Sequence, residues 1–166
     1  RQRQMCIRDS IRGVATSFRG VEHRLEFVRE VRGVRYYNDS IATSPERVVA
    51  ALNSFDGSII LLAGGKDKNL PWEEMAELTV RKVRHIIIFG ESAPKIERAI
   101  REARARLGAE GPGISLCSTL EEAVEEASRV AKPGEIVLLS PGGTSFDAFR
   151  DYAHRGERFK ELVSRL

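Results

Sequence analysis

Three short runs of hydrophobic residues stand out along the chain, at 59–63, 85–89 and 136–139. They are rich in β-branched residues and do not alternate with polar ones, which is typical of strands buried on both faces of a parallel sheet. A weaker run at 114–117 predicts a fourth strand. Two extended segments, at 25–31 and 33–38, predict a β-hairpin.

Stretches of helical periodicity lie between these runs. They predict helices over about 45–53, 72–82, 94–107, 120–131 and 145–165. We expect Ser44 and Ser92 to cap the first and third helices, Ser118 and Glu121 to form a capping box, and Gly156 to interrupt the last helix. Because strands and helices alternate, we predict a Rossmann-like, doubly wound α/β fold with a mostly parallel sheet and helices on both faces.

The composition narrows the functional classes. The 166 residues suffice for one compact domain, with 27 basic and 24 acidic residues and a net charge of +3. The excess of positive charge lies in residues 1–35, which contain nine arginines and four acidic residues. Because the rest of the chain carries no such excess, we predict no nucleic-acid partner. No apolar run approaches the roughly 18 residues of a membrane span. The two cysteines and three histidines lack metal-ligand spacing, which predicts no metal site and a cytoplasmic protein.

Small and polar residues follow the predicted strands. Glycines stand at 64–65, 90 and 142–143, and the carboxyl ends of parallel strands share one edge of a sheet. The polar residues near this edge are Asn38, Asp39, Ser40, Thr43, Lys66, Lys68, Ser140, Thr144 and Ser145. Helix N-termini also point there, so we predict an anion-binding edge. Neither a G-x-x-x-x-G-K-[ST] nor a G-x-G-x-x-G motif is present.

Four blocks of sequence carry a more specific signal. They are GVEHR at 20–24 followed by GVRYYNDSIAT at 33–43, AGGKDK at 63–68, LSPGGTSFD at 139–147, and residues 149–159 around Arg155 and Gly156. In this order and spacing they resemble the C-terminal domain of the MurD-type Mur ligases. The resemblance implies that residues 18–166 form this domain and that the N-terminal UDP-binding and central ATPase domains are missing. We expect residues 1–17 to be a non-native or linker segment, disordered at its start.

The resemblance also implies an activity for the complete bacterial enzyme. In such ligases ATP phosphorylates the carboxylate of UDP-N-acetylmuramoyl-L-alanine, and the amine of D-glutamate attacks the acyl phosphate to form an amide. ATP and Mg²⁺ would find their main ligands in the central domain, which accounts for the absent phosphate-binding motif. We therefore expect this fragment to hold no catalytic residue, to be inactive alone, and to be a monomer.

Roles for single residues follow from the same resemblance. The D-glutamate site would consist of Thr43, Lys68, Ser145, the backbone N–H of Phe146 at a helix start, and Tyr152. Arg24 would reach the phosphates of ATP and Asp39 the ribose, with His23 near the substrate. Ile41 departs from the family, since many members carry lysine there, so the contact of that lysine is lost or replaced.

Other interpretations stay open. Asp39 could be a turn residue, Ser145 a helix cap, Tyr152 a core residue, and Lys68 or Arg24 a solvated cation. The chain could be a stand-alone α/β module that binds a small anion, or the same domain of a sibling Mur or folylpolyglutamate ligase. Reading the gene upstream of residue 1 would separate the module from the ligases, and an amino-acid-dependent ATPase assay on the complete enzyme would separate the ligases.

Overall fold

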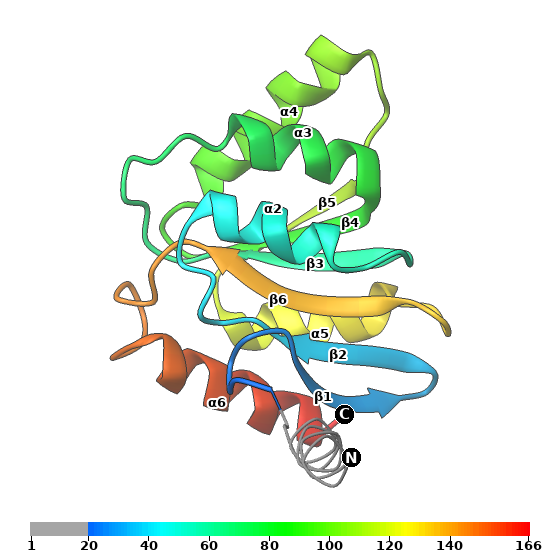
Figure 1. Cartoon of the computed structure of the whole chain (residues 1–166), viewed down its shortest axis with the longest axis vertical. Helices are drawn as coiled ribbons and strands as arrows, with labels where there is room; N and C mark the ends of the chain where they lie inside the picture. The colour runs from blue at the N-terminus through cyan, green and yellow to red at the C-terminus, as the bar shows by residue number, and fades with distance from the viewer. Residues whose placement is uncertain (1–19) are drawn as a thin grey trace, which may run out of the picture.

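The protein is described by a computed structural model over residues 20–166, so the predicted linker at 1–17 lies outside the described residues. Six strands form one sheet in the order β1-β2-β6-β3-β4-β5 (Figure 1). They are β1 (Glu26–Val31), β2 (Val34–Asn38), β3 (Ile59–Gly64), β4 (Val83–Phe89), β5 (Gly113–Cys117) and β6 (Ile136–Gly142). β1 and β2 form the predicted antiparallel hairpin, and all other neighbours are parallel. The predicted fold class is confirmed.

Helices cover both faces of the sheet. On one face lie α2 (Pro45–Asn53), α3 (Glu73–Lys82) and α4 (Ala93–Leu107), and on the other lie α5 (Leu120–Val130) and α6 (Tyr152–Ser164) (Figure 1). None of the described helices is long and apolar enough to cross a membrane. The two helical layers leave β3 buried along its whole length, as its uninterrupted apolar sequence predicts.

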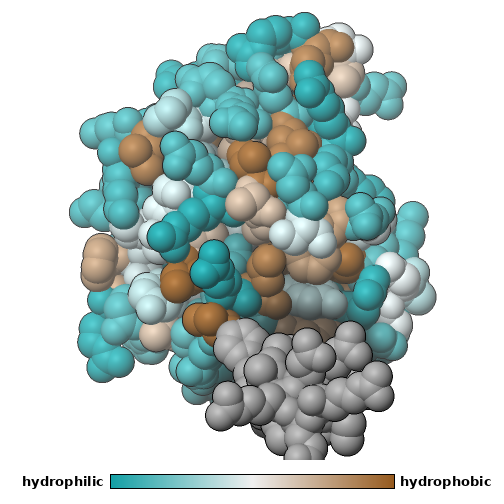
Figure 2. Space-filling model, viewed as in Figure 1, coloured by the Kyte–Doolittle hydropathy of each residue, from teal (hydrophilic) through white to brown (hydrophobic). Residues whose placement is uncertain are grey.

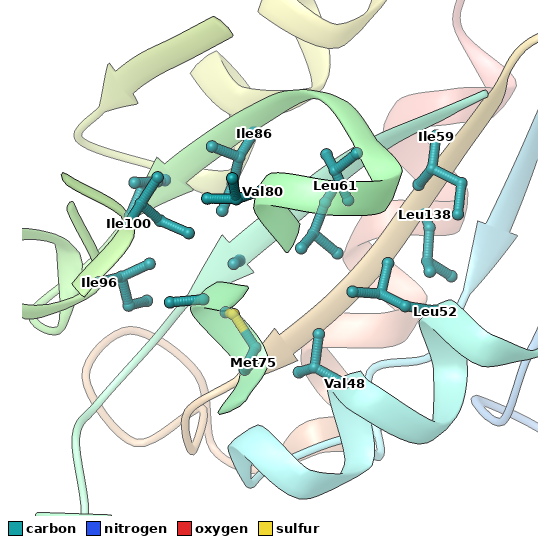
Figure 3. Packing of buried hydrophobic residues seen from close by; sticks show 14 of the residues in the cluster. Val48, Leu52, Ile59, Leu61, Met75, Val80, Ile86, Ile96, Ile100 and Leu138 are labelled. Carbon is teal, nitrogen blue, oxygen red and sulfur yellow. The ribbon is translucent and has the colours of Figure 1, made fainter. Parts of the chain in front are cut away.

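The packing on the α2–α4 face follows the helical periodicity. Side chains of Val48 and Leu52 on α2 lie against Leu138 of β6, while Met75 and Val80 come from α3 (Figure 3). Each helix thus buries one stripe of apolar residues on the same sheet. The packing of these helices on the sheet fixes the strands, and therefore also the positions of the loops that follow them.

The predicted caps of three helices need correction. The cap of α5 is Thr119, whose hydroxyl accepts a hydrogen bond from the Glu122 backbone N–H at 3.2 Å, while the Ser118 N–H donates to the Glu122 carboxylate at 2.7 Å. The box therefore lies one residue beyond the predicted Ser118–Glu121 pair. Ser44 and Ser92 do occupy the cap positions of α2 and α4, but neither side chain makes a capping hydrogen bond.

The last helix also differs from the prediction. It begins at Tyr152, not near residue 145, because the Asp151 carboxylate caps it by accepting a hydrogen bond from the His154 N–H at 2.7 Å. Gly156 does not interrupt α6. It is the point of closest approach between α6 and His23, since a Cβ there would lie 2.2 Å from Nδ1 of His23. The glycine serves a tertiary contact that local sequence does not reveal.

We expect Leu138→Ala to lower the free energy of unfolding by about 2–5 kcal/mol, because the side chain is fully buried and its removal leaves a cavity. Leu116→Ala on β5 is the matched control, since Leu116 is 58% exposed, and should change stability by under about 1 kcal/mol. Urea denaturation followed by circular dichroism measures both. Equal losses for the two variants would contradict the central position of β6.

Candidate functional site

The loops that follow β2, β3 and β6 meet at the carboxyl edge of the sheet, on the left of Figure 1. β6 lies between β2 and β3, so its loop contacts both neighbours. The Lys66 N–H donates to the Thr144 carbonyl at 2.8 Å and the Thr144 N–H to the Lys66 carbonyl at 3.0 Å. The Gly142 N–H donates to the Ala42 carbonyl at 2.8 Å. The predicted anion-binding edge is thus one continuous surface.

A buried arginine connects the loops of this edge by hydrogen bonds. The guanidinium of Arg155, on α6, donates to Oγ and the carbonyl of Ser40 at 3.0 and 2.9 Å, and to the Gly143 carbonyl at 3.1 Å. Burial lowers the pKa of Arg155 to about 10, and the nearby charge of Asp147 opposes this shift. The sequence analysis did not assign Arg155 this role, because nothing in its local sequence indicates complete burial.

The structure brings the five predicted D-glutamate residues to this edge. Thr43 follows β2, Lys68 follows β3, Ser145 and Phe146 follow β6, and Tyr152 begins α6. Lys68 is exposed, as are Phe146 at 67% and Tyr152 at 40%, so Tyr152 is not a core residue. Ser145 is buried, and its carbonyl accepts hydrogen bonds from the Ala148 and Phe149 N–H groups, but these bonds close a single turn and α6 begins only at Tyr152.

The two predicted nucleotide residues line one pocket. Arg24 and Asp39 face a cavity of about 390 Å³, together with Leu25, Ile41, Ala42, Arg47, Ala50, Ala51 and Ser54. Arg47 was missed in the sequence analysis. The sequence did offer a signal for Arg47. It lies in the first turn of the helix predicted at 45–53, and the start of that helix points to the carboxyl edge.

Asp39 is a buried carboxylate held by two neighbours. Its Oδ1 accepts a hydrogen bond from the Leu25 N–H at 3.1 Å and its Oδ2 accepts one from the Ser140 hydroxyl at 2.8 Å. Burial raises the pKa of Asp39, while these hydrogen bonds and the charges of Arg24 and Arg47 lower it. The net result is a raised pKa of about 6. Asp39 is therefore more than a turn residue, since it joins β2 to β6 and to the segment that carries Arg24.

The segment that carries Arg24 has an unusual backbone. His23 and Leu25, on either side of Arg24, have φ values of 62° and 45°, in the left-handed region that side chains other than glycine rarely adopt. Nδ2 of Asn38 lies 2.9 Å from Nδ1 of His23 and 3.0 Å from the Glu26 carboxylate. The His23 N–H donates to the same carboxylate at 3.0 Å. These contacts hold Arg24 beside the pocket.

One group of side chains in the described part of the chain has the geometry of a cation site. Glu22, His23 and Glu157 offer ligand atoms that lie within 4.8 Å of one another. The ammonium of Lys160 already lies 3.0 Å from the Glu22 carboxylate and 2.6 Å from that of Glu157. The cluster therefore contains its own counter-ion.

Comparisons with known proteins agree with this geometry. The family profile described as "Mur ligase, glutamate ligase domain" matches residues 23–143. The chain is 49% identical over 164 residues to the UDP-N-acetylmuramoylalanine–D-glutamate ligase of Acetivibrio thermocellus, covering 97% of this chain and 35% of that protein. The chain thus spans about a third of the length of such curated relatives.

Solved structures support the fold at low sequence identity. The murein peptide ligase of Psychrobacter arcticus matches 93% of this chain and 32% of its own, with a TM-score of 0.62 and 15% identity. The bifunctional folylpolyglutamate synthase/dihydrofolate synthase of Yersinia pestis matches 89% of this chain and 32% of its own, with a TM-score of 0.62 and 12% identity. The α/β architecture is therefore shared beyond the range of clear sequence similarity.

We expect Gly156→Ala to lower the free energy of unfolding by about 1–3 kcal/mol, because the new methyl group would collide with the buried His23 ring and lie 3.0 Å from Nδ2 of Asn38. Gly57→Ala is the matched control, since its Cβ would meet only Ile136 at 3.5 Å. Thermal and urea denaturation compare the two variants. If Gly156→Ala were as stable as the control, α6 would not pack on His23 as described.

The raised pKa of Asp39 predicts a pH-dependent stability difference. Between pH 3.8 and about 6 the folded state keeps a proton that the unfolded state has lost, so this residue makes stability fall as pH rises. The free energy of unfolding of the wild type minus that of Asp39→Asn should fall by on the order of 3 kcal/mol from pH 4 to pH 7. Urea titrations at several pH values measure it, with Asp56→Asn, an exposed aspartate, as control. A difference that stays constant with pH would show that Asp39 is not ionising in a buried site.

Proposed function

Because the chain belongs to the Mur ligase family through its glutamate ligase domain, we propose that it is the C-terminal, D-glutamate-binding domain of a longer ATP-dependent ligase. The complete enzyme adds D-glutamate to UDP-N-acetylmuramoyl-L-alanine in the bacterial cytoplasm, in peptidoglycan precursor synthesis. One observation carries this proposal, namely 49% identity along 97% of the chain to a protein named for that reaction. The N-terminal UDP-binding and central ATPase domains belong to the remainder of the polypeptide.

The carboxyl edge provides the groups that D-glutamate requires. Lys68, exposed on the loop after β3, holds the side-chain carboxylate through a charge-assisted hydrogen bond, and Thr43 adds a neutral donor. The Ser145 hydroxyl and the Phe146 N–H bind a carboxylate from the loop after β6, and Tyr152 lines the site. The backbone pairing of Lys66 with Thr144 supports this assignment, because it draws two of these loops together.

The neighbouring pocket accepts part of ATP. Arg24 binds phosphate oxygens and Asp39 faces the ribose, at the place where this domain meets the central domain. Mg²⁺ does not fit this pocket, because both carboxylate oxygens of Asp39 already accept hydrogen bonds and two arginines line the same cavity. The metal ligands therefore belong to the rest of the polypeptide, and we assign this domain no step that depends on the metal.

The contribution of this domain to the reaction is positioning. ATP phosphorylates the substrate carboxylate, and the D-glutamate amine then attacks the acyl carbon, forming an amide bond, releasing phosphate and losing a proton. Holding the amine next to the acyl carbon, oriented for attack on the carbonyl group, removes much of the entropic part of the barrier. Closure of the domains brings Arg24 and Asp39 to the nucleotide and excludes water from an intermediate that water would hydrolyse.

We expect Lys68→Ala in the full-length enzyme to raise the KM for D-glutamate about tenfold or more, because the ligand carboxylate loses a charged partner. The KM for ATP should change by less than about twofold. Phosphate release at varied D-glutamate concentrations measures both values.

Lys66→Ala is the matched control for this experiment. Lys66 is an exposed lysine on the same loop, and its pairing with Thr144 uses only backbone atoms that the substitution retains. An unchanged KM for D-glutamate in Lys68→Ala would remove Lys68 from the site. Release of phosphate driven by another amino acid and not by D-glutamate would indicate a sibling ligase.

A further inference from the structure

The pocket that contains Arg24 and Asp39 has one wall formed by a single face of α2. Arg47, Ala50, Ala51 and Ser54 line it, and their spacing places them on the same side of the helix. The small alanine side chains leave the cavity open, and Arg47 stands at its end nearest the start of the helix. On the face shown in Figure 2, small hydrophobic patches lie among hydrophilic side chains.

Arg47 is an unusual residue for its position. It lies in the first turn of α2, where the helix dipole disfavours a positive charge, and its guanidinium Nη1 donates to the Ile41 carbonyl at 3.2 Å. This contact uses one of five N–H donors. The ion pairs found within residues 20–166 use other basic residues. Two arginines thus face one cavity in which the nearby carboxylate, Asp39, is already hydrogen-bonded.

We propose that Arg47 is a second phosphate-binding residue of this pocket, which contacts the nucleotide together with Arg24; the identity of the nucleotide rests on the proposed function. Two guanidinium groups in the lining of one cavity suit a phosphate, because they can donate to several oxygens of one tetrahedral anion. The carboxylate of D-glutamate is the alternative anion. It fits less well, because Lys68, Ser145 and Phe146, three of the five residues proposed to bind it, lie on the loops after β3 and β6.

The test uses the full-length enzyme and a non-hydrolysable ATP analogue. Arg47→Ala should raise the dissociation constant of the analogue, measured by calorimetry, about tenfold, and should raise the KM for ATP by a similar factor. The KM for D-glutamate should change by less than about twofold. Arg81→Ala, an exposed arginine at the end of α3, is the matched control and should leave all three values unchanged.

A rescue experiment separates charge in the pocket from a structural effect. Ile41 lines the same cavity, so Ile41→Lys in the Arg47→Ala background places a new ammonium group there. We expect this double variant to bind the analogue at least about threefold more tightly than Arg47→Ala does, because a cation is again available to the phosphate. Arg47→Lys should likewise retain part of the affinity.

Three results would overturn the proposal. The first is an Arg47→Ala variant that binds the analogue as tightly as the wild type. The second is a variant in which only the KM for D-glutamate rises. The third is a double variant that binds the analogue no more tightly than Arg47→Ala does. If the wild-type enzyme failed to use D-glutamate, the proposed function would fail instead. The analogue-binding comparison would still decide the role of Arg47, since it does not depend on the amino-acid substrate.

Discussion

The buried guanidinium of Arg155 is the interaction on which the carboxyl edge depends. Its donors reach Ser40 in the loop after β2 and Gly143 in the loop after β6, two segments separated by about a hundred residues of sequence. A Cβ at Gly65 would lie 2.9 Å from Nη1 of Arg155, so the loop after β3 also packs against it closely. Removing such a donor would leave buried carbonyl groups unpaired, which is more unfavourable than the loss of the bonds themselves. One side chain therefore fixes three loops relative to one another.

The edge divides into two regions of different chemistry. The region around Asp39 combines a buried carboxylate with two arginines that line the same cavity, whereas Lys68 and Phe146 are exposed side chains on the loops after β3 and β6. The two regions share Ser140 and the β2–β6 pairing, since the Ser140 hydroxyl binds Asp39 and the next residues lead into the loop of Ser145. A ligand bound in one region therefore lies next to a ligand bound in the other. The proposed function requires such neighbouring sites, because the nucleotide and the amino acid take part in successive steps of one reaction.

Much of the fold could be predicted from the sequence, because its strongest signals are local. Continuous apolar runs such as 59–63 and 85–89 predicted buried parallel strands, and the hairpin was correct. The errors arose where a tertiary contact decides the structure. Gly156 is a glycine because His23 lies against it, and the last helix begins at Tyr152 because Asp151 caps it. The family was confirmed. Arg24 and Asp39 line one pocket, and their roles at a nucleotide stay predictions. Arg47 was missed because pocket walls depend on how α2 packs.

The sheet order has a consequence for how the chain folds. β2 and β3 are consecutive parallel strands, yet they are not paired with each other, because β6 occupies the place between them. During synthesis on the ribosome, the hairpin and the β3–β4–β5 unit emerge first and lack the strand that joins them until residues 136–142 have left the exit tunnel. Such late, long-range pairing slows folding and exposes strand edges in the meantime. The carboxyl edge, and every ligand contact proposed on it, forms only after nearly the whole domain has been made.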